Sequence, residues 1–159
     1  MFDPKERKVL LARKPQEQLY RFPGGFTSPT DDSFEAAALR ELGEETGLTV
    51  GLAGLRYVGS KRVNDWRYAN NPSEKIMTHV YIGLYGGGAP QAADDIAEVR
   101  WFDYDKLNNE IRVLDEKTGL TEDATEATLT IVEEHRPLWA MAKTYIDTNF
   151  PAPDGEMGA

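Results

Sequence analysis

The sequence predicts an α+β fold in which a mixed β-sheet lies between helices, an α/β/α arrangement. Apolar extended segments come first, one helical segment follows, further extended segments come next, and a late helical segment closes the pattern. At 159 residues, 40% of them hydrophobic, the chain is long enough for one well-cored domain and short for two. We expect that single domain over residues 1–150 and a polar tail, PAPDGEMGA, over residues 151–159.

The strands are predicted where hydrophobic runs lie between turn residues. KVLLAR at residues 8–13 follows the turn DPKERK, and a short strand at 20–22 runs into PGG. Two longer strands are expected at 55–63 and 75–85, and the second, KIMTHVYIGLY, has the β-branched and aromatic content of a central strand. A last strand is expected at 98–102, after a GGGAP turn and an acidic loop.

Two helices are predicted. The first covers residues 33–46, with Asp32 or Ser33 as N-cap and Gly47 as C-cap. A long C-terminal helix begins at a capping box formed by Asp123 and Glu126. Because proline removes a backbone donor, Pro137 is expected to kink or split that helix.

Charge and composition exclude several classes of function. A net charge of −9 argues against unassisted binding to nucleic acid or to an anionic membrane, although divalent cations can still bridge carboxylates to a phosphate-bearing substrate. The chain has no cysteine for a disulfide or a thiolate site, and its two histidines are too far apart to give a metal-binding spacing. No apolar run approaches a membrane span and the first residues do not resemble a signal peptide, so we expect a cytoplasmic protein.

The acidic segment RELGEETGL is either a solvated helix face or a site. Turning about 100° per residue from Phe34 places Glu41 and Glu45 in the middle of the apolar face and Glu44 near its edge. A solvated face would have the opposite orientation. Carboxylates directed toward a core carry a large desolvation penalty unless cations or donors satisfy them.

One basic side chain is close enough in sequence to help. Arg40 lies one turn before Glu44 and can satisfy one carboxylate, but it cannot balance three. A bound divalent cation accounts for the others, and a ligand set made only of oxygen favours Mg²⁺ or Mn²⁺. On this interpretation the segment is a metal site.

The longer stretch FPGGFTSPTDDSFEAAALRELGEETGL resembles the signature of the Nudix hydrolases, G-x5-E-x7-R-E-U-x-E-E-x-G-U, where U is aliphatic. The second half matches in full, and FPGG matches the usual lead-in. Asp32 stands in place of the first glutamate, with one extra residue between Gly25 and Asp32. In the family this acid braces the loop and the arginine, so Asp32 is expected to hold Arg40.

The resemblance implies the Nudix fold, a Mg²⁺ or Mn²⁺ cofactor, and cleavage of a nucleoside diphosphate linked to another group. Arg40 would belong to the catalytic residues, and Glu41 or a downstream glutamate would orient or deprotonate the attacking water. By position, the metal ligands would be the Gly25 carbonyl and the carboxylates of Glu41, Glu44 and Glu45.

A downstream acid is expected to complete the metal site. The segment QAADDIAEVRWFDYDKL resembles the family segment in which a glutamate before the last core strand has this role. We assign that role to Glu98, with Asp94 and Asp95 as the next candidates. The alternative interpretation is an acidic loop that merely precedes a strand.

The substrate-binding residues are expected in the loops. SKRVNDWRYANNPSEKIMTHVYIGLY followed by ADDIAEVRW resembles the ADP-ribose pyrophosphatase branch, and most closely the Nudix half of bifunctional NMN adenylyltransferase/Nudix proteins. Trp66 and Tyr68 would stack on adenine, unless they pack beneath a loop. Further candidates for contacts to phosphate or ribose are basic residues, namely Arg62 and Arg67 in this segment and Arg13 and Arg21 beside the first strands.

The function implied is that of a Mg²⁺-dependent pyrophosphohydrolase, which cleaves ADP-ribose or a related nucleoside diphosphate derivative to AMP and ribose 5-phosphate. Its partner would be a small-molecule nucleotide, with no nucleic acid or membrane involved. A nucleoside triphosphate or sugar-nucleotide pyrophosphohydrolase is one alternative. A non-catalytic module that senses ADP-ribose is another, although a sensor has no need of inward carboxylates that cost stability.

Two further expectations concern the chain start and the histidines. Nudix domains usually have a strand before the KVLLAR segment, and only Met1 and Phe2 remain for it here. Strand 8–13 is therefore expected to be an exposed edge or an edge covered by a partner chain, as in a homodimer, unless the chain is trimmed. His79 and His135 are expected to be packed residues, not ligands.

Overall fold

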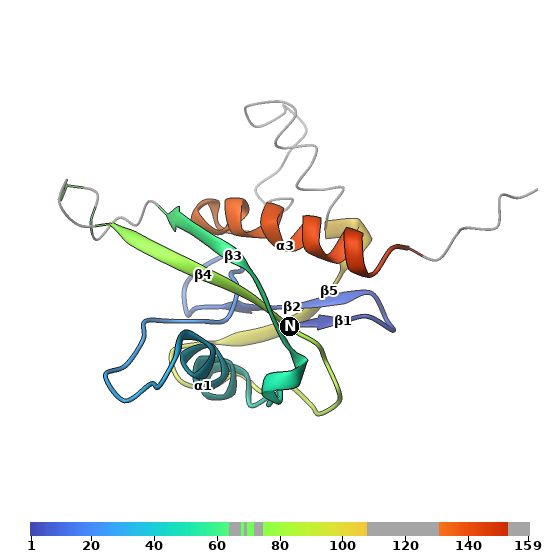
Figure 1. The fold of residues 1–159 in the computed structure, drawn as a ribbon, viewed down its shortest axis with the longest axis horizontal. Coiled ribbons are helices and arrows are strands. Elements are labelled where there is room, and N and C mark those ends of the chain that lie inside the picture. The colour runs from blue at the N-terminus through green and yellow to red at the C-terminus, as the bar shows by residue number, and fades with distance from the viewer. Residues whose placement is uncertain (64–67, 69, 72–74, 108–130, 153–159) are drawn as a thin grey trace, which may run out of the picture.

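The computed structural model describes residues 1–63, 68, 70–71, 75–107 and 131–152. Along the chain the elements are β1 (Phe2–Asp3), β2 (Lys8–Arg13), α1 (Phe34–Thr46), η1 (Leu52–Gly54), β3 (Leu55–Val63), β4 (Ile76–Gly83), β5 (Glu98–Asp103), η4 (Glu133–His135) and α3 (Arg136–Asn149). Figure 1 shows α1 and α3 on opposite sides of the strands. The predicted α/β/α layering is confirmed.

The strands form two antiparallel units, a three-stranded sheet β1-β2-β5 and the pair β3-β4. A parallel bridge between Phe2 and Leu84 joins them, and the amide of Tyr85 donates to the carbonyl of Phe2 at 2.8 Å. Parallel and antiparallel pairing therefore occur together, as expected for a mixed arrangement. The predicted bounds of β2 and β3 are confirmed, and those of β4 and β5 differ by one or two residues at an end.

The short strand predicted at residues 20–22 is wrong, because this segment forms two isolated β-bridges and no regular strand. Arg21 makes a single antiparallel bridge to Ala12, and Tyr20 makes a single parallel bridge to Ile131. The pairing does not continue beyond Arg21, because the amide of Phe22 donates to Nδ1 of His135 and Pro23 has no amide hydrogen to donate.

The prediction that β2 is an exposed or partner-covered edge is also wrong. On one side β2 pairs with β5 along its whole length. On the other side it pairs with β1, its Leu10 amide donates to the carbonyl of Met1 at 3.0 Å, and Ala12 and Arg21 exchange two hydrogen bonds. Met1, β1 and Arg21 together cover this edge, so the homodimer stays a prediction without that support.

The core lies between the sheets and α3. It gathers buried side chains from the strands and from the helix, including Leu11, Ile82, Trp139 and Ile146. The ring of Phe2 is fully buried and packs 5.5 Å from the ring of Phe150, just after α3. The Nη1 of Arg7 donates to the Phe150 carbonyl at 2.7 Å, which ties the turn after β1 to the end of the last helix.

Pro137 does not kink α3. It lies in the first turn of the helix, where its missing amide hydrogen has no intrahelical partner to lose. The capping box predicted at Asp123 and Glu126 lies outside the described residues. Over the described segments, no helix has the length and hydropathy that crossing a membrane requires.

Candidate active site

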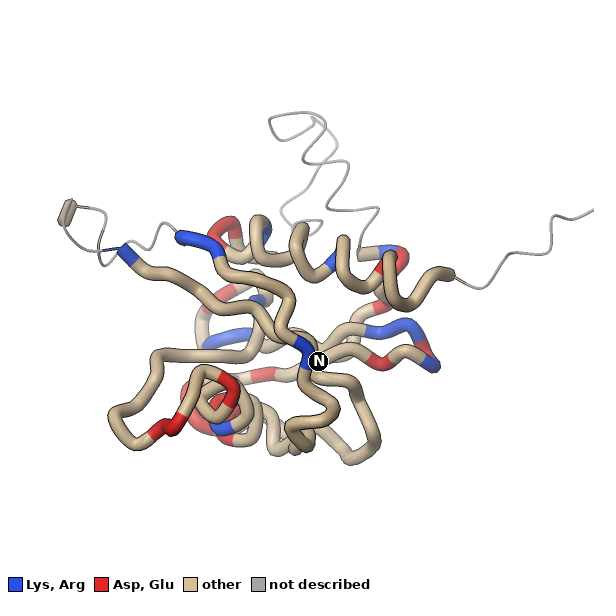
Figure 2. Tube along the Cα trace, in the orientation of Figure 1, with Lys and Arg blue, Asp and Glu red and all other residues tan. Residues whose placement is uncertain are grey.

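The acidic helix α1 is held at both ends by the residues that its sequence suggests. The Ser33 hydroxyl accepts from the amide of Ala36 at 3.0 Å, and Gly47 ends the helix in the left-handed conformation with φ of 67°. With the helix fixed in this way, Glu45 is only 4% exposed, whereas the side chain of Glu44 is 49% exposed. The predicted inward orientation is confirmed. Figure 2 shows the acidic residues gathered on and before this helix.

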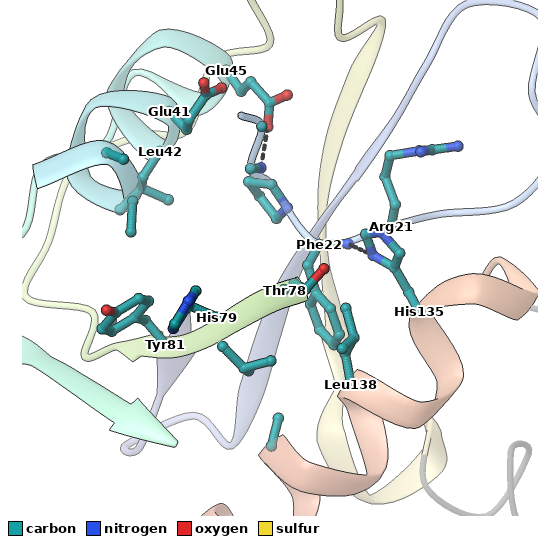
Figure 3. Close-up of a pocket in the computed structure, with 18 of the residues that line it drawn as sticks. Arg21, Phe22, Glu41, Leu42, Glu45, Thr78, His79, Tyr81, His135 and Leu138 are labelled. Carbon is teal, nitrogen blue, oxygen red and sulfur yellow. Dashed lines mark hydrogen bonds between the residues drawn. The ribbon is translucent and has the colours of Figure 1, made fainter. Parts of the chain in front are cut away.

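The glycine loop closes on two of the carboxylates. The amide of Gly24 donates to Oε2 of Glu45 at 2.8 Å (Figure 3). A Cβ atom placed on Gly25 would lie 2.6 Å from both carboxylate oxygens of Glu41, closer than real Cβ contacts come. The loop can approach the helix this closely because residue 25 has no side chain.

Arg40 connects the remaining acids. Its Nη1 donates to Glu41 and to Glu44, each at 2.8 Å, and its Nη2 donates to the carbonyl of Phe26 at 3.1 Å. Asp31 receives Nε and Nη2 at 2.9 Å each, in the bidentate geometry that an arginine and a carboxylate favour. The guanidinium is therefore held at a fixed place between the loop and the helix.

The expectation that Asp32 braces Arg40 is wrong, because Asp31 does so. The side chain of Asp31 is 7% exposed, and the hydrogen bonds from Arg40 and from the Ser28 amide lower its pKa to about 2. Asp32 is exposed. Asp31 stands at the G-x5 spacing of the signature, so the extra residue lies between this acid and Arg40 instead of before it.

Glu45 lies in surroundings that disfavour its negative charge. Burial is the main cause that raises its pKa to about 7, and the charges of Asp95 and Glu41 add to it. The Gly24 amide and Lys14 act in the opposite direction, and Lys14 also pairs with Asp95. A divalent cation would counter all three unfavourable effects, so this oxygen donor set fits Mg²⁺ or Mn²⁺.

The carboxylates do not converge on a single point at which a cation could bind. Among the described residues, no three histidine, aspartate or glutamate side chains converge closely enough to hold a metal ion. Arg40 binds Glu41 and Glu44 here, as the distances above show.

A cavity of about 560 Å³ lies beside α1. Its walls include α1, the glycine loop, β4 and α3, as Figure 3 shows. Its volume is within the range of pockets that enclose small molecules. Among the described residues, the charged lining is formed by Lys14, Arg21, Glu41, Glu45, Asp94, Asp95 and Glu134, and the aromatic lining includes Phe22, Phe26, Phe34, His79, Tyr81 and His135.

A model of the NUDIX domain matches residues 1–128 of the chain. The chain belongs to the Nudix family. The resemblance to the Nudix signature seen in the sequence is confirmed. No curated protein is similar enough to match this chain.

Two solved Nudix structures, with TM-scores of 0.57 and 0.50, share the fold. The NUDIX domain of Shewanella oneidensis NrtR, solved with ADP ribose, is 21% identical with a TM-score of 0.57, over 87% of this chain and 77% of that one. A bifunctional NMN adenylyltransferase/ADP ribose pyrophosphatase from Francisella tularensis, solved with AMP and a manganese ion, is 21% identical with a TM-score of 0.50, over 89% of this chain and 37% of that one. A MutT/nudix family protein from Enterococcus faecalis is 32% identical with a TM-score of 0.49, over 60% of this chain and 36% of that one. The chain thus spans little more than a third of the length of two of these proteins.

Glu98 is not among the described residues that line the cavity beside Glu41 and Glu45. Glu98 begins β5, and its Oε2 accepts from Nε and Nη2 of Arg13 at 3.0 and 2.7 Å. Hydrogen bonds from Arg13 and then from Tyr20 lower its pKa. Asp94 and Asp95 line the cavity instead. The metal or base role of Glu98 stays a prediction, with these two aspartates better placed.

The predicted substrate residues are only partly gathered. Arg21 lines the cavity, although Glu17 binds its guanidinium at 2.6 to 3.1 Å. Arg13 is engaged by Glu98 and by the carbonyl of Glu17 at 2.9 Å. Arg62 is exposed near the end of β3, and Tyr68 is half-buried; neither is among the described residues that line the cavity. Trp66 and Arg67 lie outside the described residues.

An aromatic wall of the cavity was not identified from the sequence. Phe34 is 51% exposed, and its ring stacks on His79 at a centroid distance of 4.0 Å. The Tyr81 hydroxyl donates to Glu35 at 3.0 Å. His79 packs against a ring, as expected, but it is half-buried and also lines the cavity. Alternation along β4 puts residues 77, 79 and 81 on one face, and that signal could have revealed the wall.

His135 makes a hydrogen bond that the sequence did not reveal. Its Nδ1 accepts from the amide of Phe22 at 3.0 Å, and the two rings stack at 5.7 Å. Burial is the main cause that lowers its pKa to about 4, and the charge of Arg21 adds to it. The imidazole is therefore neutral near pH 7 and packed, as expected, and it is also a hydrogen-bond acceptor.

Proposed function

We propose that this Nudix domain is a divalent-cation-dependent pyrophosphohydrolase that cleaves ADP-ribose or a related nucleoside diphosphate derivative to AMP and ribose 5-phosphate. The observation that carries the proposal is the buried carboxylate of Glu45, 4% exposed, beside Glu41 on the wall of a cavity of about 560 Å³. A carboxylate buried there with no functional role would lower the stability of the fold and contribute nothing else. A cation bound between these oxygens and a diphosphate gives the carboxylates a role.

The chain supplies the ligands for that cation. Glu41, Glu44 and Glu45 would hold Mg²⁺ or Mn²⁺, helped by the backbone carbonyl of Gly25. When bound, the ion would neutralise charge on the phosphate oxygens, which is the main requirement of phosphoryl substitution.

The remaining residues orient these ligands and the water. The bidentate pair with Asp31 holds Arg40, and Arg40 in turn positions Glu41 and Glu44. The Gly24 amide fixes one oxygen of Glu45. Glu41 or a downstream acid would orient or deprotonate the attacking water, and Asp94 and Asp95 are the downstream acids on the cavity wall.

The choice of ADP-ribose is supported by the resemblance of the β3–β4 region and by two structural relatives. The NrtR domain was solved with ADP ribose, and the Francisella tularensis enzyme was solved with AMP and manganese. The contacts of Trp66, Tyr68, Arg62 and Arg67 with the substrate belong to the same proposal, as does a cytoplasmic location.

A hydrolysis panel tests the proposal. ADP-ribose, nucleoside triphosphates and nucleotide sugars are each incubated with the protein and Mg²⁺ or Mn²⁺, and products are identified by mass. ADP-ribose is expected to give AMP and ribose 5-phosphate, and in ¹⁸O-water the label should enter a phosphate product and no sugar carbon. Release of pyrophosphate from nucleoside triphosphates, with ADP-ribose untouched, would overturn the substrate. A protein that binds ADP-ribose and hydrolyses nothing would be a sensing module.

A further inference from the structure

The glycine loop is tied to the last helix as well as to α1. On the α3 side, Nδ1 of His135 accepts from the amide of Phe22 at 3.0 Å. The Phe22 ring lies nearly parallel to the rings of His135 and Trp139, at 5.7 and 6.2 Å with interplanar angles of 20° and 19°. The amide and the ring of Phe22 are thus both held by residues at the start of α3.

On the α1 side, Gly24 donates to Glu45 two residues later, at 2.8 Å. Pro23 lies between the two tied residues, and its ring restricts φ and leaves no amide to donate. The amides of Phe22 and Gly24 are therefore consecutive donors along this stretch, one directed to α3 and the other to α1. Figure 3 shows both hydrogen bonds on the same short segment.

His135 can accept this hydrogen bond only through an unprotonated Nδ1. The imidazole is mostly buried, and the guanidinium of Arg21 lies near enough to oppose a second positive charge. The environment therefore keeps the ring in its accepting form.

We propose that His135 is a positioning residue that holds the Phe22–Gly25 loop against Glu41 and Glu45. Its effect on turnover rests on the proposed function, whereas its effect on the loop does not. The side chain touches neither carboxylate; it acts through the amide of Phe22 and the short segment that follows.

The first experiment needs no metal and no substrate. Three proteins are compared by NMR: the wild type, His135→Leu, which keeps bulk without an acceptor, and His135→Asn, whose amide oxygen can take the place of Nδ1. In the wild type, the ¹⁵N shift of His135 should show an unprotonated Nδ1. His135→Leu should raise amide hydrogen exchange at Phe22 and Gly24 about tenfold or more, and His135→Asn should restore most of the protection. Unchanged exchange at both amides in His135→Leu, or a protonated Nδ1 in the wild type, would overturn the proposal.

The second experiment measures hydrolysis of the substrate found by the panel. His135→Leu should lower kcat about tenfold and raise the Mg²⁺ concentration for half-maximal rate by a similar factor, with KM for the nucleotide changed less than twofold. His135→Asn should recover kcat to within about threefold. Ile131→Ala, which changes a buried core residue that is not among the described residues lining the cavity, serves as a control for lost stability and should keep kcat. Equal losses of kcat in Ile131→Ala and His135→Leu would show a merely structural role. If the wild type cleaves none of the compounds, the proposed function fails, and the NMR comparison still decides the role of His135 in the loop.

Discussion

Arg40 is the side chain on which the acidic part of the site depends, because it binds Asp31, Glu41 and Glu44 at once. Helical periodicity predicted which glutamates face inward, since their directions follow from the turn angle alone. It could not show which of two adjacent aspartates reaches the arginine. That choice is made by the loop conformation, in which the Ser28 amide and Arg40 together fix Asp31.

The two adjacent aspartates give a matched pair of variants. Asp31→Asn should lower the melting temperature and reduce kcat by about 10- to 100-fold, because a guanidinium that loses its bidentate partner no longer holds Glu41 and Glu44 in place. Asp32→Asn changes an exposed neighbour and should stay within twofold of the wild type. Thermal melts and initial rates check both variants. Equal effects of the two changes would contradict the assignment of Asp31.

Glu45→Gln should raise the thermal stability of the protein without metal and reduce the stabilisation that Mg²⁺ provides. In the folded state the pKa of Glu45 is raised from the usual 4.5 to about 7. The carboxyl group therefore favours folding at low pH, and this contribution to stability is lost as the pH rises from 4.5 through 7. At pH 8 without metal, Glu45→Gln should therefore melt at a higher temperature than the wild type. Mg²⁺ should stabilise the wild type, by about 2.7 kcal/mol at 100 times its Kd, and stabilise the variant far less.

Differential scanning calorimetry at pH 8, with and without Mg²⁺, measures these effects. Glu133→Gln removes an exposed carboxylate outside the cavity and should respond to Mg²⁺ as the wild type does. Equal metal stabilisation of the wild type and Glu45→Gln would remove Glu45 from the ligand set.

At the scale of elements, the predictions were right where neighbouring residues determine the structure. They were wrong where a segment distant in sequence determines it. The caps of α1 are local, and Ser33 and Gly47 were both among the residues expected. The pairing of β2 is not local, because its second edge is completed by residues before the turn and by Arg21. The effect of Pro137 depends on where its helix begins. Because α3 begins at Arg136, Pro137 lies in the first turn and is tolerated there. The sequence contains no strong signal that ends a helix before Arg136, so this start was not predicted.

The contact between the glycine loop and α1 leads to a prediction at this scale. Gly25→Ala should leave the melting temperature within a few degrees of the wild type, because the atoms that its Cβ meets are the far end of a flexible glutamate. The displaced carboxylate of Glu41 should lower kcat by about 100-fold. Gly86→Ala is the matched control, since its Cβ would meet no atom within 4 Å. A Gly25→Ala protein with normal turnover would show that the loop need not approach Glu41.

At the scale of the whole molecule, the acidic helix lies on one side of the strands and α3 on the other (Figure 1). Residues of both helices line the cavity. The sequence predicted this fold and the Nudix family, because both follow from patterns within short segments. It predicted the substrate contacts less well. Arg13 and Glu98 were expected to serve substrate and metal, yet they bind each other across β2 and β5.

The last substrate prediction distinguishes base recognition by Trp66 from base recognition by the aromatic wall of the cavity. If Trp66 stacks on adenine, Trp66→Ala should raise KM for ADP-ribose about five- to tenfold, with a smaller change in kcat, since one aromatic contact contributes about 1 kcal/mol. Phe34→Ala, which removes a ring of the cavity wall, should then change KM less than twofold. Steady-state kinetics on ADP-ribose check both variants. The reverse order of effects would move base recognition from Trp66 to the aromatic wall.

The contacts of Phe2 and Arg7 with Phe150 bear on how the chain folds. Arg7 and Phe150 are 143 positions apart, so their contact closes nearly the whole chain into a loop, at a large entropic cost. Such a closure is expected late, after the nucleus has formed. Phe150→Ala removes the ring contact with Phe2, although it keeps the carbonyl that Arg7 binds. It should therefore accelerate unfolding and leave the refolding rate in stopped-flow experiments almost unchanged. Slower refolding in that variant would place the joining of the two chain ends at the start of the folding pathway.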